Sequence, residues 1–175
     1  GRLDEGVPFS RAVAEAKKKG FTEPDPRDDL AGKDVERKIL IIAREAGISC
    51  EPADIKTERI FPAGFDDSGS VDEFLQKLVG LDDYFKDKIE KLKAKGRVLR
   101  MAASIEKGVC RVGLVEVGAS DPLYGIRDGE NAFVFRTERY APIPLTVHGY
   151  GAGAEVTAAG VFGDILRTVS WNPEA

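Results

Sequence analysis

The chain has 175 residues, of which 42% are apolar and 32% charged, and a formal net charge of -4. This composition excludes a disordered chain, because it supplies enough hydrophobic material for a core. The length fits one domain over residues 1–175, with two small domains possible. A nucleic-acid-binding surface needs a basic excess, which is absent, so we expect no nucleic-acid partner. No apolar run approaches the ~20 residues of a membrane span, so we expect no membrane contact.

The two cysteines, Cys50 and Cys110, belong to no ligand motif. Sparse cysteine use is typical of a reducing compartment, and no signal peptide is recognisable, so we expect a cytoplasmic protein. The single histidine, His148, lies at the end of an expected strand, where a satisfied or exposed side chain is the commoner role. Because this histidine lies far along the chain from the acidic residues between Glu23 and Asp34, we predict no metal site.

Helical signals dominate the first part of the chain. In "DVERKILIIAREAG" the apolar residues Val35, Ile39, Ile42 and Ala46 follow helical spacing. Ser70 and Glu73 form the capping-box pattern at the start of another helix. The sequence therefore predicts helices within 8–20, over 34–46, within 70–78 and within 82–96. Between the first and second helices it predicts a loop stiffened by two prolines. Between the second and third helices it predicts a connection around a short strand at 57–61.

The pattern changes to period two near residue 97, where alternate residues of "RVLRMAASI" share one face. "VCRVGLVEV" follows after "EKG", which suits a hairpin. We predict strands at 97–105, 109–117, 131–139 and 143–148, and a last helix over 154–169. The expected fold class is α+β, with a mixed or antiparallel sheet and helices packed on one face.

The stretch "TEPDPRDDLAGKDVERK", from Thr22 to Lys38, has an unusual density of carboxylates between Glu23 and Asp34, at Glu23, Asp25, Asp28, Asp29 and Asp34. Asp34 and Lys38 are four residues apart on a predicted helix, so their side chains meet on one face. At a surface such a pair contributes only ~0.3–0.5 kcal/mol. Beside a rigid acidic loop, the same pair would suit an amino acid or another zwitterion. A calcium loop is the rival interpretation, but its D-x-D-x-D-G spacing is absent.

A second unusual stretch, "PLTVHGYGAGAEVTAAG", leads from a predicted strand through Gly149, Gly151 and Gly153 into a helix. Glycines let a backbone approach a ligand closely, and a helix N-terminus favours anions. A full dinucleotide fingerprint needs a further βαβ unit, for which too few residues remain. The turn is therefore interpreted as structural or as one wall of a cofactor pocket built mostly elsewhere.

Taken together, "GFTEPDPRDDLAGKDVERK" and "GYGAGAEVTAAGVFGDILR" resemble homoserine dehydrogenase. "FSRAVAEAKKKG" and "ENAFVFRTERY" match the family in the expected order, so the resemblance covers nearly the whole chain. Two positions depart from the family pattern. Phe21 stands where tyrosine is usual, which removes a hydroxyl, and Tyr150 stands where proline is usual, which makes the turn less rigid.

The resemblance implies NAD- or NADP-dependent interconversion of L-homoserine and L-aspartate 4-semialdehyde, a step of threonine and methionine biosynthesis. Glu23 and Asp29 would hold the amino-acid part of this small-molecule substrate. Asp34 and Lys38 would lie at the reacting oxygen and also bind the substrate. The implied cofactor-binding residues are Gly151, Gly153, Ala154 and Glu155.

The resemblance also implies a homodimer whose sheets join across the interface. The family's nucleotide-binding half, which binds most of the cofactor, precedes the matched region. We therefore expect this chain to be the substrate-binding and dimerisation part of a longer enzyme, and to be inactive alone. Two alternatives remain open at this point: a purely structural dimerisation module, and an amino-acid-binding domain without redox chemistry.

Overall fold

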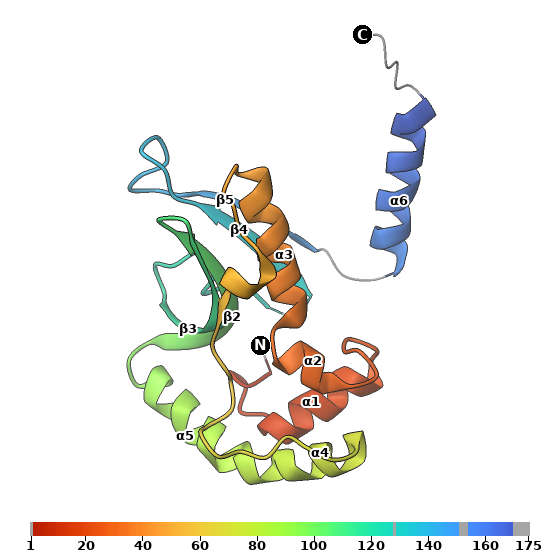
Figure 1. Cartoon of the computed structure of the whole chain (residues 1–175). Helices are drawn as coiled ribbons and strands as arrows, with labels where there is room; N and C mark the ends of the chain where they lie inside the picture. Colours follow the sequence, from red (N-terminus) through yellow and green to blue (C-terminus); the bar gives the residue numbers. More distant parts are fainter. Residues whose placement is uncertain (1, 128, 151–153, 170–175) are drawn as a thin grey trace. The chain divides into compact units, whose positions relative to one another are not determined.

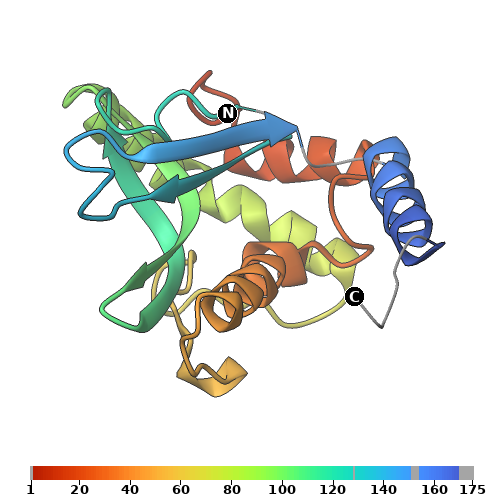
Figure 2. The same ribbon diagram turned by 90° about the horizontal axis from the view of Figure 1, so that it is seen from above.

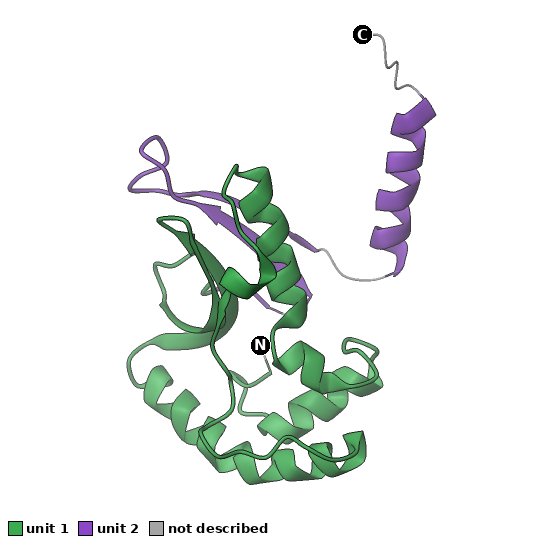
Figure 3. Cartoon of the chain, in the orientation of Figure 1, with its two compact units in different colours: residues 1–124 green, residues 125–175 purple. Residues whose placement is uncertain are grey.

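The computed structural model describes residues 2–127, 129–150 and 154–169 (Figure 1). The chain divides into two compact units, residues 1–124 and residues 125–175 (Figure 3). The first unit combines helices with a three-stranded sheet, and the second contains a two-stranded sheet and a helix. The predicted α+β class is confirmed. None of the described helices has the length and apolar content needed to cross a membrane.

Five α-helices and two 3-10 helices make up the helical part of the first unit within residues 2–124. Local sequence signals explain their limits: Ser70 and the side chain of Glu73 form the predicted capping box, with the Ser70 backbone N–H donating to Glu73 Oε2 at 2.7 Å. The elements are α1 (Phe9–Lys18), α2 (Pro26–Leu30), α3 (Lys33–Glu45), η1 (Pro52–Asp54), α4 (Val71–Lys77), η2 (Leu78–Leu81) and α5 (Asp82–Lys93).

The sheet of the first unit is mixed, with strand order β1-β3-β2. β2 (Arg97–Glu106) and β3 (Val109–Gly118) form the predicted antiparallel hairpin, and β1 (Lys56–Thr57) pairs with β3 in parallel. Lys107 and Gly108 connect the hairpin, both with positive φ, as a two-residue turn between twisted strands requires.

Helices α3 and α5 pack on one face of this sheet. Leu99, Ala103 and Ile105 alternate along β2 and therefore point to the same side. Ile39 and Ala43 of α3 pack near Ala103 and Ile105, whereas α5 packs Ile89 and Leu92 against Leu99. The predicted placement of helices on one sheet face is confirmed for this unit.

The cysteines belong to the same core. Cys50 and Cys110 are both buried, and their sulfur atoms lie 3.7 Å apart as free thiols. Burial raises the pKa of the Cys110 thiol. Sixty residues separate the pair along the chain, and no sequence motif indicated this proximity.

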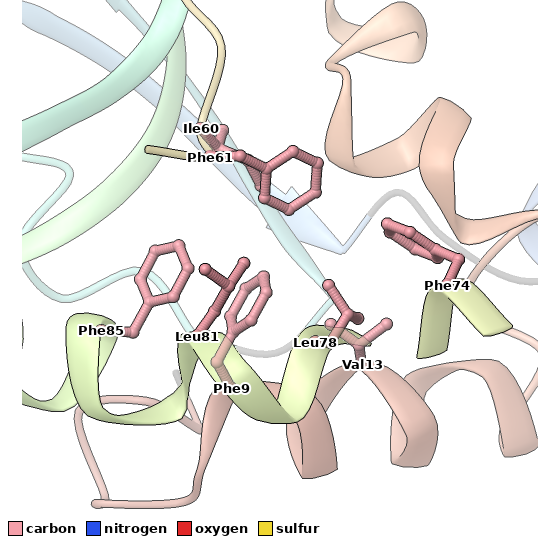
Figure 4. Packing of buried hydrophobic residues seen from close by; sticks show 8 residues of the cluster. All are labelled: Phe9, Val13, Ile60, Phe61, Phe74, Leu78, Leu81 and Phe85. Atoms are coloured by element: carbon pink, nitrogen blue, oxygen red, sulfur yellow. The ribbon is translucent and has the colours of Figure 1, made fainter. Parts of the chain in front are cut away.

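Helix α1 runs beside the segment from α4 to α5 (Figure 1; Figure 2), and a second core joins them. Phe9 and Phe85 stack with ring centroids 4.0 Å apart, and Asp82 accepts hydrogen bonds from the backbone N–H and hydroxyl of Ser10, both at 2.7 Å. Figure 4 shows the members of this cluster: Phe9, Val13, Ile60, Phe61, Phe74, Leu78, Leu81 and Phe85.

The second unit contains β4 (Glu130–Phe135), β5 (Leu145–Tyr150) and α6 (Ala154–Val169). The strands pair antiparallel, with Glu130 opposite Tyr150. The prediction of a strand to residue 139 is wrong, because pairing ends at Phe135 and the Tyr140 N–H donates to Thr137 Oγ1 in the connecting loop. The predicted span of the last helix is confirmed.

Three other expectations need correction. The acidic segment is not only a loop, since residues 26–30 form α2. The strand expected at 57–61 comprises only residues 56–57, because its backbone pairing with β3 is brief. The four main strands belong to two separate sheets rather than one, because β4 and β5 pair with each other.

Replacing Gly32 by alanine is expected to cost about 1–3 kcal/mol of unfolding free energy. Gly32 has φ 75°, and an added Cβ would lie 3.1 Å from Val112 Cγ1 in the core. The left-handed conformation alone costs a non-glycine residue about 1–2 kcal/mol. Gly47→Ala is the matched control, since its φ is 76° and nothing lies within 4 Å of the added Cβ. Urea unfolding should show the larger loss for Gly32→Ala; an equal loss would mean that the contact with Val112 is unimportant.

Candidate functional site

The acidic turn, residues 22–30, begins as an extended segment and ends as helix α2. Asp25 caps the helix, with its Oδ1 accepting the Arg27 backbone N–H at 3.0 Å, and buried Pro26 occupies the first helical turn. An acidic N-cap followed by proline is a favourable start for a helix. That signal was present in the sequence, but α2 is only five residues long and shows no apolar periodicity.

Glu23 and Asp29, the residues expected to hold an amino group, are joined directly. The Glu23 backbone N–H donates to Asp29 Oδ2 at 3.0 Å. The side chain of Glu23 is exposed, and that of Asp29 is partly exposed. The contact holds the Glu23 backbone against the Asp29 carboxylate, so the two acidic residues lie next to each other in the acidic turn.

Asp34 and Lys38 lie on α3, as predicted, and form an ion pair with 2.7 Å between Lys38 Nζ and Asp34 Oδ2. Their side chains are 61% and 56% exposed, respectively. Ile39 and Ala43 bury the opposite stripe of the helix against the sheet, so the polar pair faces outward.

The acidic turn and the ion pair are linked by a short connection. The N–H of Ala31 donates to Arg27 O, and that of Gly32 donates to Asp29 O, so α2 closes just before α3 starts. Gly32 then takes the left-handed conformation from which α3 begins at Lys33. Two residues therefore connect the helix carrying Asp29 to the helix carrying Lys38.

Arg27 is a constituent of this region that the sequence interpretation missed. Its Nη2 donates to Asp25 Oδ2 at 2.6 Å, and its Nε lies 2.9 Å from both carboxylate oxygens of Asp25. The hydrogen bonds from the Arg27 side chain lower the pKa of Asp25 below its ordinary value. A sequence gives no direct sign of this pairing, because charged neighbours two residues apart commonly point elsewhere.

The Asp25–Arg27 contact predicts a loss of stability in acid. Because the folded-state pKa of Asp25 is lowered, the pair stabilises the fold above the unfolded pKa, near 3.8, and the contribution disappears as the pH falls through the folded value. We expect the difference in melting temperature between wild type and Asp25→Asn to shrink from about pH 6 to about pH 2. Melting curves across this range test it, and a constant difference would contradict it.

The second candidate region is described only in part. Gly151 and Gly153 lie outside the described residues, whereas Ala154 and Glu155 begin α6 and are exposed. Preceding them on β5, His148 Nε2 lies 3.4 Å from Glu130 Oε2 on the paired strand. Within residues 2–127, 129–150 and 154–169, no three histidine, cysteine, aspartate or glutamate residues form a group that could hold a metal ion.

Comparisons with known proteins identify the family of the chain. The family model described as homoserine dehydrogenase matches residues 1–166. The chain belongs to the homoserine dehydrogenase family. A bifunctional aspartokinase/homoserine dehydrogenase of Haemophilus influenzae is 54% identical over 169 residues, which are 97% of this chain and 21% of that relative. The chain thus spans about a fifth of the length of such curated relatives.

Solved structures agree on the fold. A Candida auris protein described as of unknown function has a TM-score of 0.82 and 36% identity, over 92% of this chain and 46% of the other. An S. aureus homoserine dehydrogenase has a TM-score of 0.70 and 23% identity, over 95% of this chain and 38% of the other. The second likeness concerns the fold alone. Both solved chains contain substantial regions beyond the one that this family member matches.

Proposed function

We propose that this chain is the substrate-binding part of a dehydrogenase that interconverts L-homoserine and L-aspartate 4-semialdehyde. Family membership supports the reaction class. The observation that carries the assignment of residues is the Asp34–Lys38 pair, at 2.7 Å, on the helix that follows the acidic turn within two residues. A small substrate with a cationic amino group at one end and a reacting oxygen at the other matches an acidic turn followed closely by a lysine.

The acidic turn binds the substrate ammonium in this proposal. Glu23 and Asp29 offer carboxylates on a turn that their own hydrogen bond closes. Hydrogen bonds between charged groups are roughly twice as strong as neutral ones, so they can orient a small amino acid. Uncharged analogues of the amino group would leave these acids without their partner.

Lys38 acts at the oxygen that reacts. In the reduction direction, its ammonium donates a hydrogen bond to the aldehyde oxygen and supplies a proton as negative charge develops there. In the oxidation direction, the neutral amine accepts the proton of the hydroxyl. Asp34 orients the lysine through their ion pair. Solvent exchanges the proton between turnovers, since the Lys38 side chain is exposed.

A nicotinamide cofactor, NAD or NADP, supplies the hydride chemistry when bound. We propose that a nucleotide-binding domain of the same enzyme holds most of it, with Gly151, Gly153, Ala154 and Glu155 near the nicotinamide. The small side chain of Ala154 at the exposed start of α6 is compatible with close approach of a ring. The carboxylate of Glu155 is compatible with the positive charge of the oxidised ring.

We also propose a homodimer joined through the second unit. Its sheet has two strands, β4 and β5, so within the described residues each strand has one unpaired edge. Four apolar side chains of these strands are exposed: Phe133, Phe135, Leu145 and Val147. A second copy would pair with an edge by extending the sheet, and packing between the two copies would cover the apolar side chains. Sedimentation should give twice the monomer mass, and a monomer at micromolar concentration would overturn this proposal.

The function is tested by oxidation of L-homoserine in an enzyme that carries this domain with its nucleotide-binding domain. We expect reduction of NAD or NADP that depends on L-homoserine. With 4-hydroxybutanoate, which lacks the amino group, kcat/KM should fall at least about tenfold, since the acidic turn would lose its charged partner. L-Homoserine binding without turnover would instead favour an amino-acid-binding domain, and neither binding nor turnover would reject the proposal.

A further inference from the structure

Arg27 connects the acidic turn to a loop that lies forty residues further along the chain. On its own turn, the guanidinium binds the carboxylate of Asp25. On the other side, Nη1 donates to the backbone oxygens of Asp67 at 3.1 Å and Gly69 at 2.9 Å. The N–H donors of Arg27 are therefore divided between two separate segments. Only the planar guanidinium of arginine presents several donors in such a fixed geometry.

The ring of Phe74 completes the contact. Arg27 Cζ lies 5.5 Å from the centroid of this ring, and Phe74 is fully buried in the core shown in Figure 4. A cation over an aromatic face is attracted by the ring quadrupole. The guanidinium thus rests on a side chain that cannot move without disturbing the core.

The loop that receives Arg27 is itself firmly held. Lys77 Nζ binds Asp66 Oδ2 at 2.6 Å and Ser68 O at 3.1 Å, and the capping box of Ser70 and Glu73 fixes the following residues. Gly69 has φ 92°, and a Cβ there would lie 2.8 Å from Glu73 Oε2. The partners of Arg27 therefore form a rigid anchor rather than an adaptable surface.

We propose that Arg27 is a positioning residue, which fixes the acidic turn on the 67–69 backbone and Phe74 so that Glu23 and Asp29 are held ready for a substrate ammonium. This inference rests on the proposed function of the turn. Its physical basis is that a turn with several carboxylates repels itself, and Arg27 both neutralises Asp25 and fixes the turn in space. A misplacement of about 1 Å in a binding group can cost up to about a hundredfold in rate.

A second arginine provides a matched control. Arg59 Nη2 donates to Phe65 O at 3.0 Å and to Asp67 Oδ2 at 2.7 Å, and Arg59 Cζ lies 5.6 Å from the centroid of the Phe61 ring. It therefore makes the same kinds of contact, to the same loop and the same core. These partners lie outside the acidic turn, so Arg59 supports the same loop and core without contacting the turn that Arg27 holds.

The experiment compares Arg27→Ala, Arg27→Lys and Arg59→Ala in the enzyme that carries the domain. We expect Arg27→Ala to raise KM for L-homoserine between about tenfold and a hundredfold, with kcat reduced less and KM for the cofactor unchanged. Arg27→Lys should recover only part of the loss, because lysine lacks the planar fork. Arg59→Ala should stay within about twofold of wild type in KM, whatever its effect on melting temperature.

If Arg27→Ala and Arg59→Ala changed KM equally, Arg27 would be only a structural contact, and the proposal would be overturned. An unchanged KM in Arg27→Ala would also overturn it. A second readout needs no substrate. In the 175-residue chain, backbone order parameters of residues 22–30 should fall from about 0.85 to below about 0.6 in Arg27→Ala but not in Arg59→Ala. A wild-type enzyme without homoserine oxidation would reject the proposed function, and the order parameters would still decide whether Arg27 holds the turn.

Discussion

Replacement of Lys38 by alanine should lower kcat for L-homoserine by about 10²–10³-fold and change KM little. A charge at the reacting oxygen interacts most strongly when negative charge has developed there, so its loss falls mainly on the transition state. If the 2.7 Å contact with Asp34 were only a surface ion pair, its loss would cost under about 1 kcal/mol of stability and nothing in rate. These two expectations differ by orders of magnitude.

The same helix supplies the control for this experiment. Lys33, whose side chain is 52% exposed, forms an ion pair with the partly buried Glu36, with 2.9 Å between Lys33 Nζ and Glu36 Oε2. Lys33→Ala removes a comparable charge from α3 and should leave kcat within about twofold of wild type. Steady-state kinetics at saturating cofactor, with melting curves for each variant, measure the effect. If Lys38→Ala also kept kcat within about twofold, the proposed role of Lys38 would be wrong.

Phe74→Ala should destabilise the fold by about 3–5 kcal/mol, the usual cost of removing a buried aromatic side chain. Phe74 is fully buried, and its ring centroid lies 6.0 Å from that of Phe61 and 6.5 Å from that of Phe65, with edge-on geometry. The truncation would leave a cavity in the core and also remove the ring beneath Arg27. We therefore expect it to disturb the acidic turn as well as the core.

Phe21→Ala is the comparison for the packing contribution, because the Phe21 side chain is 65% exposed. That substitution should change the free energy of unfolding by no more than about 0.5 kcal/mol. Urea unfolding of the 175-residue chain measures both values. A loss below about 1 kcal/mol for Phe74→Ala would show that the core relaxes to fill the cavity, contrary to the packing described.

The parts of the fold that the sequence predicted depend on contacts between near neighbours. The Asp34–Lys38 pair follows from helical spacing, the capping box of Ser70 and Glu73 from a four-residue pattern, and the β2–β3 hairpin from alternation on both sides of a short turn. Such interactions form within one element or between adjacent elements. They can therefore be recognised from the spacing of residues in the sequence.

The missed features depend on partners that lie far apart along the chain. Arg27 meets the backbone at Asp67 and Gly69, and Cys50 meets Cys110. The division of the strands between two sheets is likewise a matter of non-local pairing. Periodicity identifies which face of a strand is apolar, but it does not identify the strand beside it.

The candidate site contains contacts that spacing predicts and contacts that it does not. Spacing alone placed Lys38 beside Asp34, whereas the contact between Glu23 and Asp29 depends on the local shape of the acidic turn. The chemical roles of these residues came from resemblance to the family rather than from spacing. The structure adds the physical reason for their arrangement, namely that α2, Gly32 and α3 follow one another without a flexible linker.

The orientation of bound L-homoserine most directly tests whether the acidic turn binds one end of the substrate and Lys38 the other. A crystal structure of the enzyme that carries this domain, with L-homoserine and oxidised cofactor bound, would measure it. We expect the substrate nitrogen within about 3.2 Å of the carboxylates of Glu23 or Asp29, and the hydroxyl oxygen within about 3.2 Å of Lys38 Nζ. A hydroxyl directed at the acidic turn, or a substrate bound away from both ends, would contradict the account.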